Sequence, residues 1–180
     1  MKRLVFHIIS LEDTLDFKPI YENLKDTKVL INPDKKEIKT ELEENQDTDV
    51  IFLGHGDHKG LYDKNMKEYC VDHEIVELLK NRFVIGIWCF AAEFADRYGL
   101  HGFFTSDFIS NEKEFHNTFT EINTLINDED IHLLNRLFSL RLFDLINSEI
   151  NPSLWVNKLQ QEVSHSLVEK YNYEALSYYE

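Results

Sequence analysis

Short apolar runs recur along residues 1–110, separated by polar or amphipathic segments. The runs are brief and rich in β-branched or aromatic residues, which is typical of strands buried in a parallel sheet rather than of free-standing helices. Asn-Pro-Asp or glycine follows some of them and indicates a turn. We therefore predict five strands: Leu4–Ile9, Lys28–Ile31, Val50–Gly54, Phe83–Trp88 and Gly102–Thr105.

Between these runs, apolar residues recur at helical spacing. After the first strand, Phe17, Ile20 and Leu24 form one apolar face of a helix that would pack on the sheet. The segment 37–45 is mostly charged, so we expect a short exposed helix there. The alternation of strands and helices predicts an α/β fold with a doubly wound, mostly parallel sheet flanked by helices. The helices predicted in this part are Leu11–Lys25, Glu37–Asn45, Val71–Lys80 and Phe90–Tyr98.

From Asn111 onward, helical spacing dominates the pattern and predicts a helical C-terminal part. The middle helix of this part has an apolar face that must be buried against the sheet or against another subunit, so a homo-oligomer through the C-terminal helices stays an open alternative. The expected helices are Asn111–Ile126, Asp130–Ser148 and Pro152–Tyr171. The tyrosines near the end of the chain are expected to pack on helices: Tyr171, Tyr173, Tyr178 and Tyr179.

No linker rich in proline, glycine or serine separates the two parts. We expect residues 1–180 to form a single domain, with an α/β sheet core at 1–110 and a helical part at 111–180 packed on it. Apolar residues make up 43% of the chain and charged residues 29%, which is compatible with a folded core.

Charge and cysteine content exclude several classes of function. The net charge of −14 argues against binding to nucleic acid, because such binding depends on clusters of lysine and arginine. Only six apolar-rich residues follow Arg3, too few for a signal peptide, and no run has the length of a membrane-spanning helix. We therefore expect no membrane partner and a cytoplasmic location. In that reducing compartment Cys70 and Cys89 are expected to be unpaired.

Two of the predicted strands end at chemically capable residues. His55 follows Val50–Gly54, and Cys89 follows Phe83–Trp88. In an open α/β sheet, ligands bind beyond the carboxyl ends of the strands, so the imidazole and the thiol are expected at one edge. A helix directly after Cys89 would favour the thiolate. A cysteine hydrolase needs such a thiol nucleophile and a group that transfers protons.

The segments Val50–Gly56 and Val84–Cys89, an apolar strand that ends in His-Gly and a later one that ends in Cys, resemble the caspase-like fold of cysteine peptidases. That superfamily includes caspases, gingipain-like and legumain-like enzymes, separase and bacterial CHAT proteases. In it these strands are the third and fourth of the sheet, as they are along this chain. The resemblance implies that Cys89 attacks the scissile carbonyl, that His55 protonates the leaving amine, and that the backbone amides of Gly56 and Cys89 hold the oxyanion.

The resemblance also implies a substrate pocket and a protein or peptide substrate. The segment 105–112 occupies the place where relatives line the pocket for the residue before the cut, and there Asp107 would select a basic residue. A bulky Trp88 stands where caspases have a small residue, so the caspase preference for aspartate is not carried over. The candidate pocket residues are Asp57, Trp88, Ser106 and Asp107.

Three other interpretations stay open at this point. His55, Asp57 and His58 form a short run of the kind that ligates metals in some hydrolases, but no second cluster completes it, so we expect no metal and no cofactor. Cys89 would be a core residue if the chain were a non-catalytic α/β binding module of the same architecture. It would still be the nucleophile in a cysteine-dependent amidase that acts on small molecules.

The composition is rich in Lys, Glu, Asn and Ile, which indicates an AT-rich bacterial or phage genome. Caspase-like proteins of such genomes are often defence or regulatory effectors, an inference that rests on analogy of fold alone. No long insert separates Cys89 from the fifth strand, so we expect the chain to stay uncut in its active form. Cys70, which has no companion residue, is expected to be structural.

Overall fold

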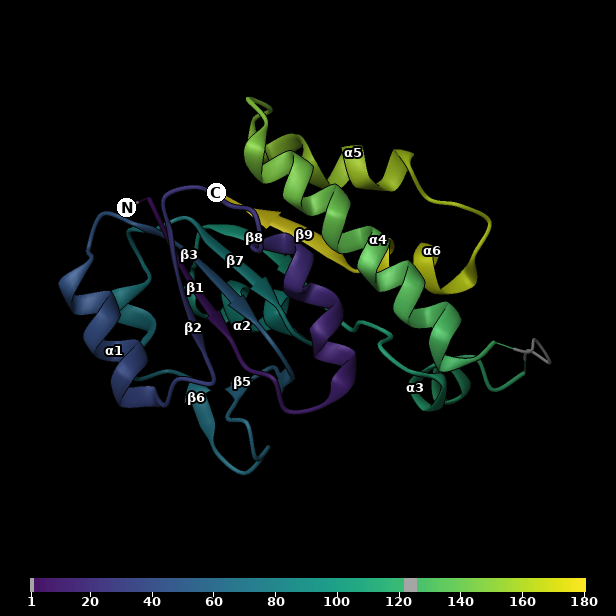
Figure 1. The fold of residues 1–180 in the computed structure, drawn as a ribbon, viewed down its shortest axis with the longest axis horizontal. Helices are drawn as coiled ribbons and strands as arrows, with labels where there is room; N and C mark the ends of the chain where they lie inside the picture. Colours follow the sequence, from purple (N-terminus) through teal and green to yellow (C-terminus); the bar gives the residue numbers. More distant parts are fainter. Residues whose placement is uncertain (1, 122–125) are drawn as a thin grey trace.

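A six-stranded sheet forms the centre of the computed structural model, which describes residues 2–121 and 126–180 (Figure 1). The strand order is β2-β1-β3-β7-β8-β9, and β9 alone runs antiparallel to its neighbour. An α/β fold with a mostly parallel sheet flanked by helices is thereby confirmed. The strands are β1 Arg3–His7, β2 Thr27–Ile31, β3 Asp49–Leu53, β7 Val84–Ile87, β8 Gly102–Thr105 and β9 Leu176–Tyr179.

The region between β3 and β7 contains a second, antiparallel sheet of β4 Gly56–Asp57, β5 Gly60–Tyr62 and β6 Tyr69–Val71. The predicted crossover helix Val71–Lys80 is wrong, because the segment holds the end of β6 and a short 3₁₀ turn, η2 Val76–Leu78. The apolar residues that suggested a helix are nevertheless buried. Ile75 and Leu79 are at most 1% exposed, so an irregular segment satisfies the same burial.

Two helices cover one face of the sheet together with this small sheet. They are α1 Lys35–Glu44 and α2 Ala91–Tyr98. Asp34 caps α1 by accepting from the Glu37 amide, and the Glu37 carboxylate accepts from the Asp34 amide, which satisfies two unpaired amides. The helix predicted at Glu37–Asn45 is therefore confirmed with an earlier start. Helix α1 is exposed on its charged side, and Ile38 and Leu42 anchor it in the core.

The opposite face is covered by η1 Glu12–Ile20 and by helices of the C-terminal part (Figure 1). The helix predicted at Leu11–Lys25 is shorter than expected and has 3₁₀ geometry, with Pro19 inside it. Proline lacks the amide that an α-helix interior requires. The remaining helices are α3 Glu112–Thr118, α4 Asp128–Asn147, η3 Pro152–Leu154, α5 Trp155–Gln161 and α6 Leu167–Glu174.

The single helix predicted at Pro152–Tyr171 is wrong. It is divided into η3, α5 and α6, and the chain between α5 and α6 is not helical. The Ser164 amide donates there to the Glu169 carboxylate, an alternative to a helical hydrogen bond. The helix predicted at Asn111–Ile126 is confirmed over α3 but is wrong at 119–121 and 126, which are not helical, and residues 122–125 of it lie outside the described part. The helix predicted at Asp130–Ser148 is confirmed as α4.

The last strand, β9, was not predicted. Tyr178 and Tyr179 were expected to pack on helices, but they pair with Phe103 and Gly102 of β8. The C-terminal part therefore completes the sheet as well as covering it. The first strand, β1, and the last strand, β9, therefore belong to the same sheet.

The outer face of α4 exposes three leucines at helical spacing, Leu133, Leu137 and Leu140. Their exposed fractions are 68%, 37% and 46%.

Within residues 2–121 and 126–180, every helix is either too short or too polar to cross a membrane.

Candidate active site

His55 and Cys89 leave the sheet at the carboxyl ends of two adjacent parallel strands. β3 pairs with β7, and Leu53 lies opposite Ile87 in this pair. The Gly54 amide donates to the Ile87 carbonyl at 3.1 Å, which keeps the two strand ends together. Both residues line one pocket at this edge. Its lining residues are Thr14, Phe17, Gly54, His55, Ile87, Trp88, Cys89, Phe108 and Ser110.

The pocket is small. Its volume is about 10 Å³, close to the space that one water molecule needs. Phe17, Ile87 and Phe108 make its wall largely apolar. A side chain of a substrate cannot enter a space of this size, so a peptide would have to lie across the mouth of the pocket.

Cys89 is partly exposed and lies at a sharp turn between β7 and α2. Its Sγ is 3.5 Å from the Phe108 carbonyl oxygen, to which the thiol donates a weak hydrogen bond. Phe90, the next residue, has a left-handed conformation with φ 66° and caps α2. A non-glycine residue with this backbone angle is uncommon and costs about 1 kcal/mol or more. The surrounding contacts hold it, since the Phe90 amide donates to the Ser106 carbonyl at 3.0 Å.

Trp88 anchors the strand end that carries Cys89. Its amide donates to Thr105 Oγ1 at 3.2 Å, and the Thr105 hydroxyl donates to the Trp88 carbonyl at 2.8 Å. The indole is 2% exposed and packs in the core between the sheet and α2. It contacts Phe52 and Phe94 edge-on. Trp88 therefore lines the pocket from a buried position.

The His-Gly segment opens the small antiparallel sheet. The Tyr62 amide donates to the His55 carbonyl at 2.9 Å, and Gly56 lies opposite Leu61. Hydrogen-bonded and non-bonded pairs alternate in an antiparallel ladder, so the Gly56 amide points away from β5. A Cβ atom at Gly56 would lie 2.3 Å from Trp88 Cδ1, so only glycine fits here.

The other candidate pocket residues do not line this pocket. The Ser106 hydroxyl donates to Glu93 at 3.1 Å, and the Tyr171 hydroxyl donates to Asp107 at 2.8 Å. Asp57 is partly buried, which raises the pKa of its carboxyl, but hydrogen bonds from the Lys59 amide and from two tyrosines lower that pKa below its usual range. Asp57 thus belongs to the small sheet.

Tyr171 of α6, expected from the sequence only to pack on helices, donates its hydroxyl proton to Asp107 at 2.8 Å. Burial, together with the Asp107 carboxylate that accepts its hydrogen bond, raises the pKa of Tyr171 to about 12, and a thiolate at Cys89 contributes to this rise. The tyrosine therefore stays protonated at neutral pH. It does not itself line the pocket.

Thr14 and Phe17 of η1 were also missed, whereas Phe108 and Ser110 beyond β8 belong to the segment 105–112 that was expected to line a substrate pocket. They line the pocket because β1 lies next to β3 and β8 next to β7, so the segments after all four strands meet. From the sequence, we applied the rule that ligands bind beyond the carboxyl ends of parallel strands only to His55 and Cys89. The segments after β1 and β8 lie on the same edge.

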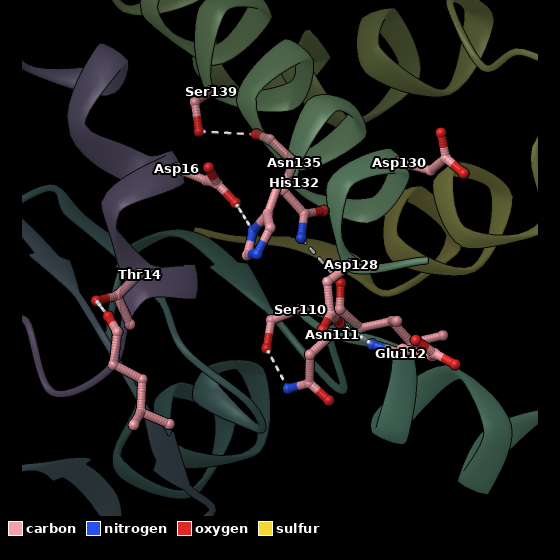
Figure 2. A network of polar contacts seen from close by, with 12 residues as sticks. Thr14, Asp16, Ser110, Asn111, Glu112, Asp128, Asp130, His132, Asn135 and Ser139 are labelled. Atoms are coloured by element: carbon pink, nitrogen blue, oxygen red, sulfur yellow. Dashed lines mark hydrogen bonds and ion pairs between the residues drawn. The ribbon is translucent and has the colours of Figure 1, made fainter. Parts of the chain in front are cut away.

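Polar contacts join η1 and α3 to α4 (Figure 2). His132 of α4 lies 2.6 Å from the Asp16 carboxylate of η1. The Glu112 amide donates to Asp128 at 2.6 Å and thereby joins the start of α3 to that of α4. The Asn135 side chain of α4 donates to the Ile109 carbonyl at 3.1 Å, which holds α4 against the loop that carries Phe108 and Ser110.

Cys70 and the histidines offer no metal site. Among the described residues, no group of three or more His, Cys, Asp or Glu could hold a metal ion. The Cys70 thiol is buried and donates to the Tyr62 carbonyl at 3.2 Å. Burial raises the pKa of this thiol to about 12, so Cys70 is an unreactive core residue.

No protein-family model matches the sequence, and the search of curated proteins found no relative.

Proposed function

We propose that the protein is a caspase-like cysteine peptidase in which Cys89 is the nucleophile and His55 transfers protons. One observation supports this proposal above others: two strands deliver the imidazole and the thiol to a single pocket at the carboxyl edge of the sheet. These strands are also the third and fourth of the main sheet in chain order, as in the superfamily that the sequence resembles.

In the proposed reaction His55 first takes the proton of the Cys89 thiol, and the resulting thiolate attacks the scissile carbonyl carbon. A C–S bond forms, and the electron pair of the C=O bond moves to oxygen, where the amides of Gly56 and Cys89 would donate to it. The C–N bond then breaks as His55 donates a proton to the leaving amine. Water hydrolyses the thioester and restores the thiol. The thiol must first leave the Phe108 carbonyl, to which it donates only weakly.

A peptide would lie across the mouth of the pocket, because the pocket holds no more than about one water. Around this mouth, Trp88 lines the wall, whereas Ser106 and Asp107 would act from further out. Asp107 accepts from a neutral tyrosine and forms no ion pair with any described residue, so it can attract a basic side chain. The substrate class proposed is therefore a protein or peptide. The acidic net charge argues against nucleic acid.

One observation favours a second candidate, a non-catalytic binding module. Cys89 packs against the core cluster between the sheet and the C-terminal helices, and its thiol already has a hydrogen-bond acceptor in Phe108. A cysteine that serves only packing has these properties. In that case Cys89→Ala would reduce stability and leave function unchanged.

The experiment that decides between these candidates is cleavage of a peptide library by four proteins: wild type, Cys89→Ala, His55→Ala and Cys70→Ala. We expect Cys89→Ala to abolish cleavage, and His55→Ala to reduce it by about 100-fold or more, the usual contribution of general acid catalysis. Cys70→Ala is the matched control, because it removes a buried thiol that does not line the pocket and should retain activity.

The proposal fails if Cys89→Ala still cuts the same peptides as wild type. If the wild type cuts no peptide but hydrolyses a small amide in a Cys89-dependent way, the protein is an amidase instead. The mass of the active protein should equal that of the intact chain. Two fragments on a denaturing gel would contradict the expectation of an uncut chain.

The cellular setting follows by analogy of fold alone. We propose a cytoplasmic defence or regulatory effector from a bacterium or phage. The exposed leucines of α4 are the surface through which a homo-oligomer would form.

A further inference from the structure

Asp57 is the centre of a compact cluster on the small sheet. Its Oδ2 accepts from the hydroxyls of Tyr62 and Tyr69, each at 2.9 Å, and its Oδ1 accepts from the Lys59 amide at 2.7 Å. The two tyrosine rings stack at 4.9 Å with an interplanar angle of 20°. One carboxylate thus joins all three short strands, β4, β5 and β6.

Strands of two or three residues need such support. A short antiparallel hairpin is only marginally stable on its own, because few ladder hydrogen bonds offset the loss of chain entropy. The small sheet comprises β4, β5 and β6, none of which is longer than three residues. The Asp57 cluster adds charge-assisted hydrogen bonds, which are stronger than neutral ones.

Asp57 is also connected to the strand end that carries Cys89 and to the segment that carries His55. The Asp57 carbonyl accepts from Trp88 Nε1 at 3.3 Å, and Trp88 precedes Cys89. Gly56, which precedes Asp57, packs closely against the Trp88 indole, since a Cβ atom at Gly56 would overlap Trp88 Cδ1. His55 is tied to β5 through its carbonyl, which accepts from Tyr62.

We propose that Asp57, with Tyr62 and Tyr69, forms a positioning cluster that sets the place of His55 and of the Gly56 amide relative to Cys89. The cluster acts through the backbone of β4 and the Trp88 indole and does not touch substrate. This inference rests on the proposed peptidase function. It gives Asp57 a role different from the substrate contact that the resemblance implies.

The ionisation states of the cluster fit this role. The Lys59 amide and the tyrosine hydroxyls keep the pKa of Asp57 below its usual range, despite partial burial. Burial, with the hydrogen bonds of Tyr62 and Asp57, raises the pKa of Tyr69 above its usual range. The carboxylate stays an acceptor and the hydroxyl a donor near neutral pH. The charge of His58 also lowers the pKa of Asp57.

The test measures kcat and KM of Asp57→Asn on the peptide that the wild type cleaves best, together with alkylation of Cys89 by iodoacetamide. We expect kcat to fall about 100-fold, the effect of a misplacement of about 1 Å. KM and the alkylation rate should stay within about threefold, because neither binding nor the thiol itself changes. Tyr62→Phe and Tyr69→Phe should each lower kcat about 10-fold, the value of one hydrogen bond.

Asp63→Asn is the matched control. Asp63 also accepts backbone hydrogen bonds, from Lys67 and Glu68, but it lies in the turn between β5 and β6 and has no contact with Trp88. Its kcat should equal that of the wild type. If Asp57→Asn does not fold, the two phenylalanine variants, which leave the ring volume unchanged, take its place.

Two outcomes would overturn the inference without touching the proposed function. One is a folded Asp57→Asn protein with the kcat of the wild type. The other is a parallel loss of kcat, Cys89 alkylation and thermal stability, which would indicate a merely structural residue. Peptide cleavage that persists in Cys89→Ala would instead overturn the proposed function, and the inference with it.

Discussion

His7 is fully buried at the end of β1, and both of its ring nitrogens have partners. Nε2 lies 2.9 Å from the Thr14 carbonyl, which can only accept, so the proton belongs on Nε2. Nδ1 then accepts from the Tyr21 hydroxyl at 2.9 Å. Burial lowers the pKa of His7 to about 4, although the hydrogen bond to Thr14 opposes this. The neutral imidazole thereby fixes η1, and with it Thr14 of the pocket, to the sheet.

This arrangement predicts a loss of stability in acid. The contribution of His7 is complete above pH 6.5, its ordinary pKa, and is lost as the pH falls through about 4, because the unfolded chain then binds the proton more readily. The full effect is about 3 kcal/mol. His7→Gln does not titrate, so its free energy of unfolding in urea should fall less steeply between pH 6.5 and 4. Parallel curves for the two proteins would contradict the prediction.

At the scale of elements, Arg141 joins α4 to α6. It forms an ion pair with Glu169, whose side chain is fully buried, and its guanidinium donates to the Tyr173 hydroxyl at 2.8 Å. Burial raises the pKa of Glu169, but the hydrogen bonds from Ser164 and Arg141 lower it below its usual range overall. Helix α6 leads directly into β9, so this pair helps to hold the last strand in the sheet.

Removal of one partner of the Arg141–Glu169 pair should therefore lower the free energy of unfolding more than removal of both partners. We expect Arg141→Met to lower the free energy of unfolding by about 3–5 kcal/mol, because it leaves a buried carboxylate without its cation. Adding Glu169→Leu should recover part of this loss. A double-mutant cycle by chemical denaturation measures the coupling. Additive effects of the two substitutions would show that the pair is not coupled.

The elements also show where sequence patterns were sufficient. All five predicted strands exist, because buried parallel strands are apolar over their whole length and their pattern is local. Helices were predicted less well. In the segments 71–80 and 152–171, Ile75, Leu79, Trp155, Leu159 and Val168 are buried, yet 3₁₀ turns, a short strand and a break replace regular helices, because tertiary burial does not require helical geometry.

At the scale of the whole molecule, residues 1–110 do not contain a complete core. One face of the sheet, with Ile51, Ile85 and Phe103, is covered by α4 and α5, and β9 pairs with β8. Without the C-terminal part this apolar face would meet water, and burial of such a face is the main source of stability.

The fragment 1–110 should therefore not fold alone, whereas the full chain should unfold in one cooperative transition. Circular dichroism during urea unfolding measures both. A fragment ending at Glu174, which lacks only β9, should show a lower midpoint than the full chain. A cooperative transition in fragment 1–110 would contradict the single-domain prediction.

The sequence by itself determined the α/β class, five of the strands, and the two strand ends at which His55 and Cys89 stand, because these features depend on local patterns of apolar residues and on the common edge of parallel strands. Only the tertiary structure decided which other residues meet there. Thr14 and Phe17 reach the site through strand order and helix packing, and Asp57 turns into the small sheet through contacts that no pattern encodes. Such contacts arise from packing between distant segments, and a short window of sequence contains no record of them.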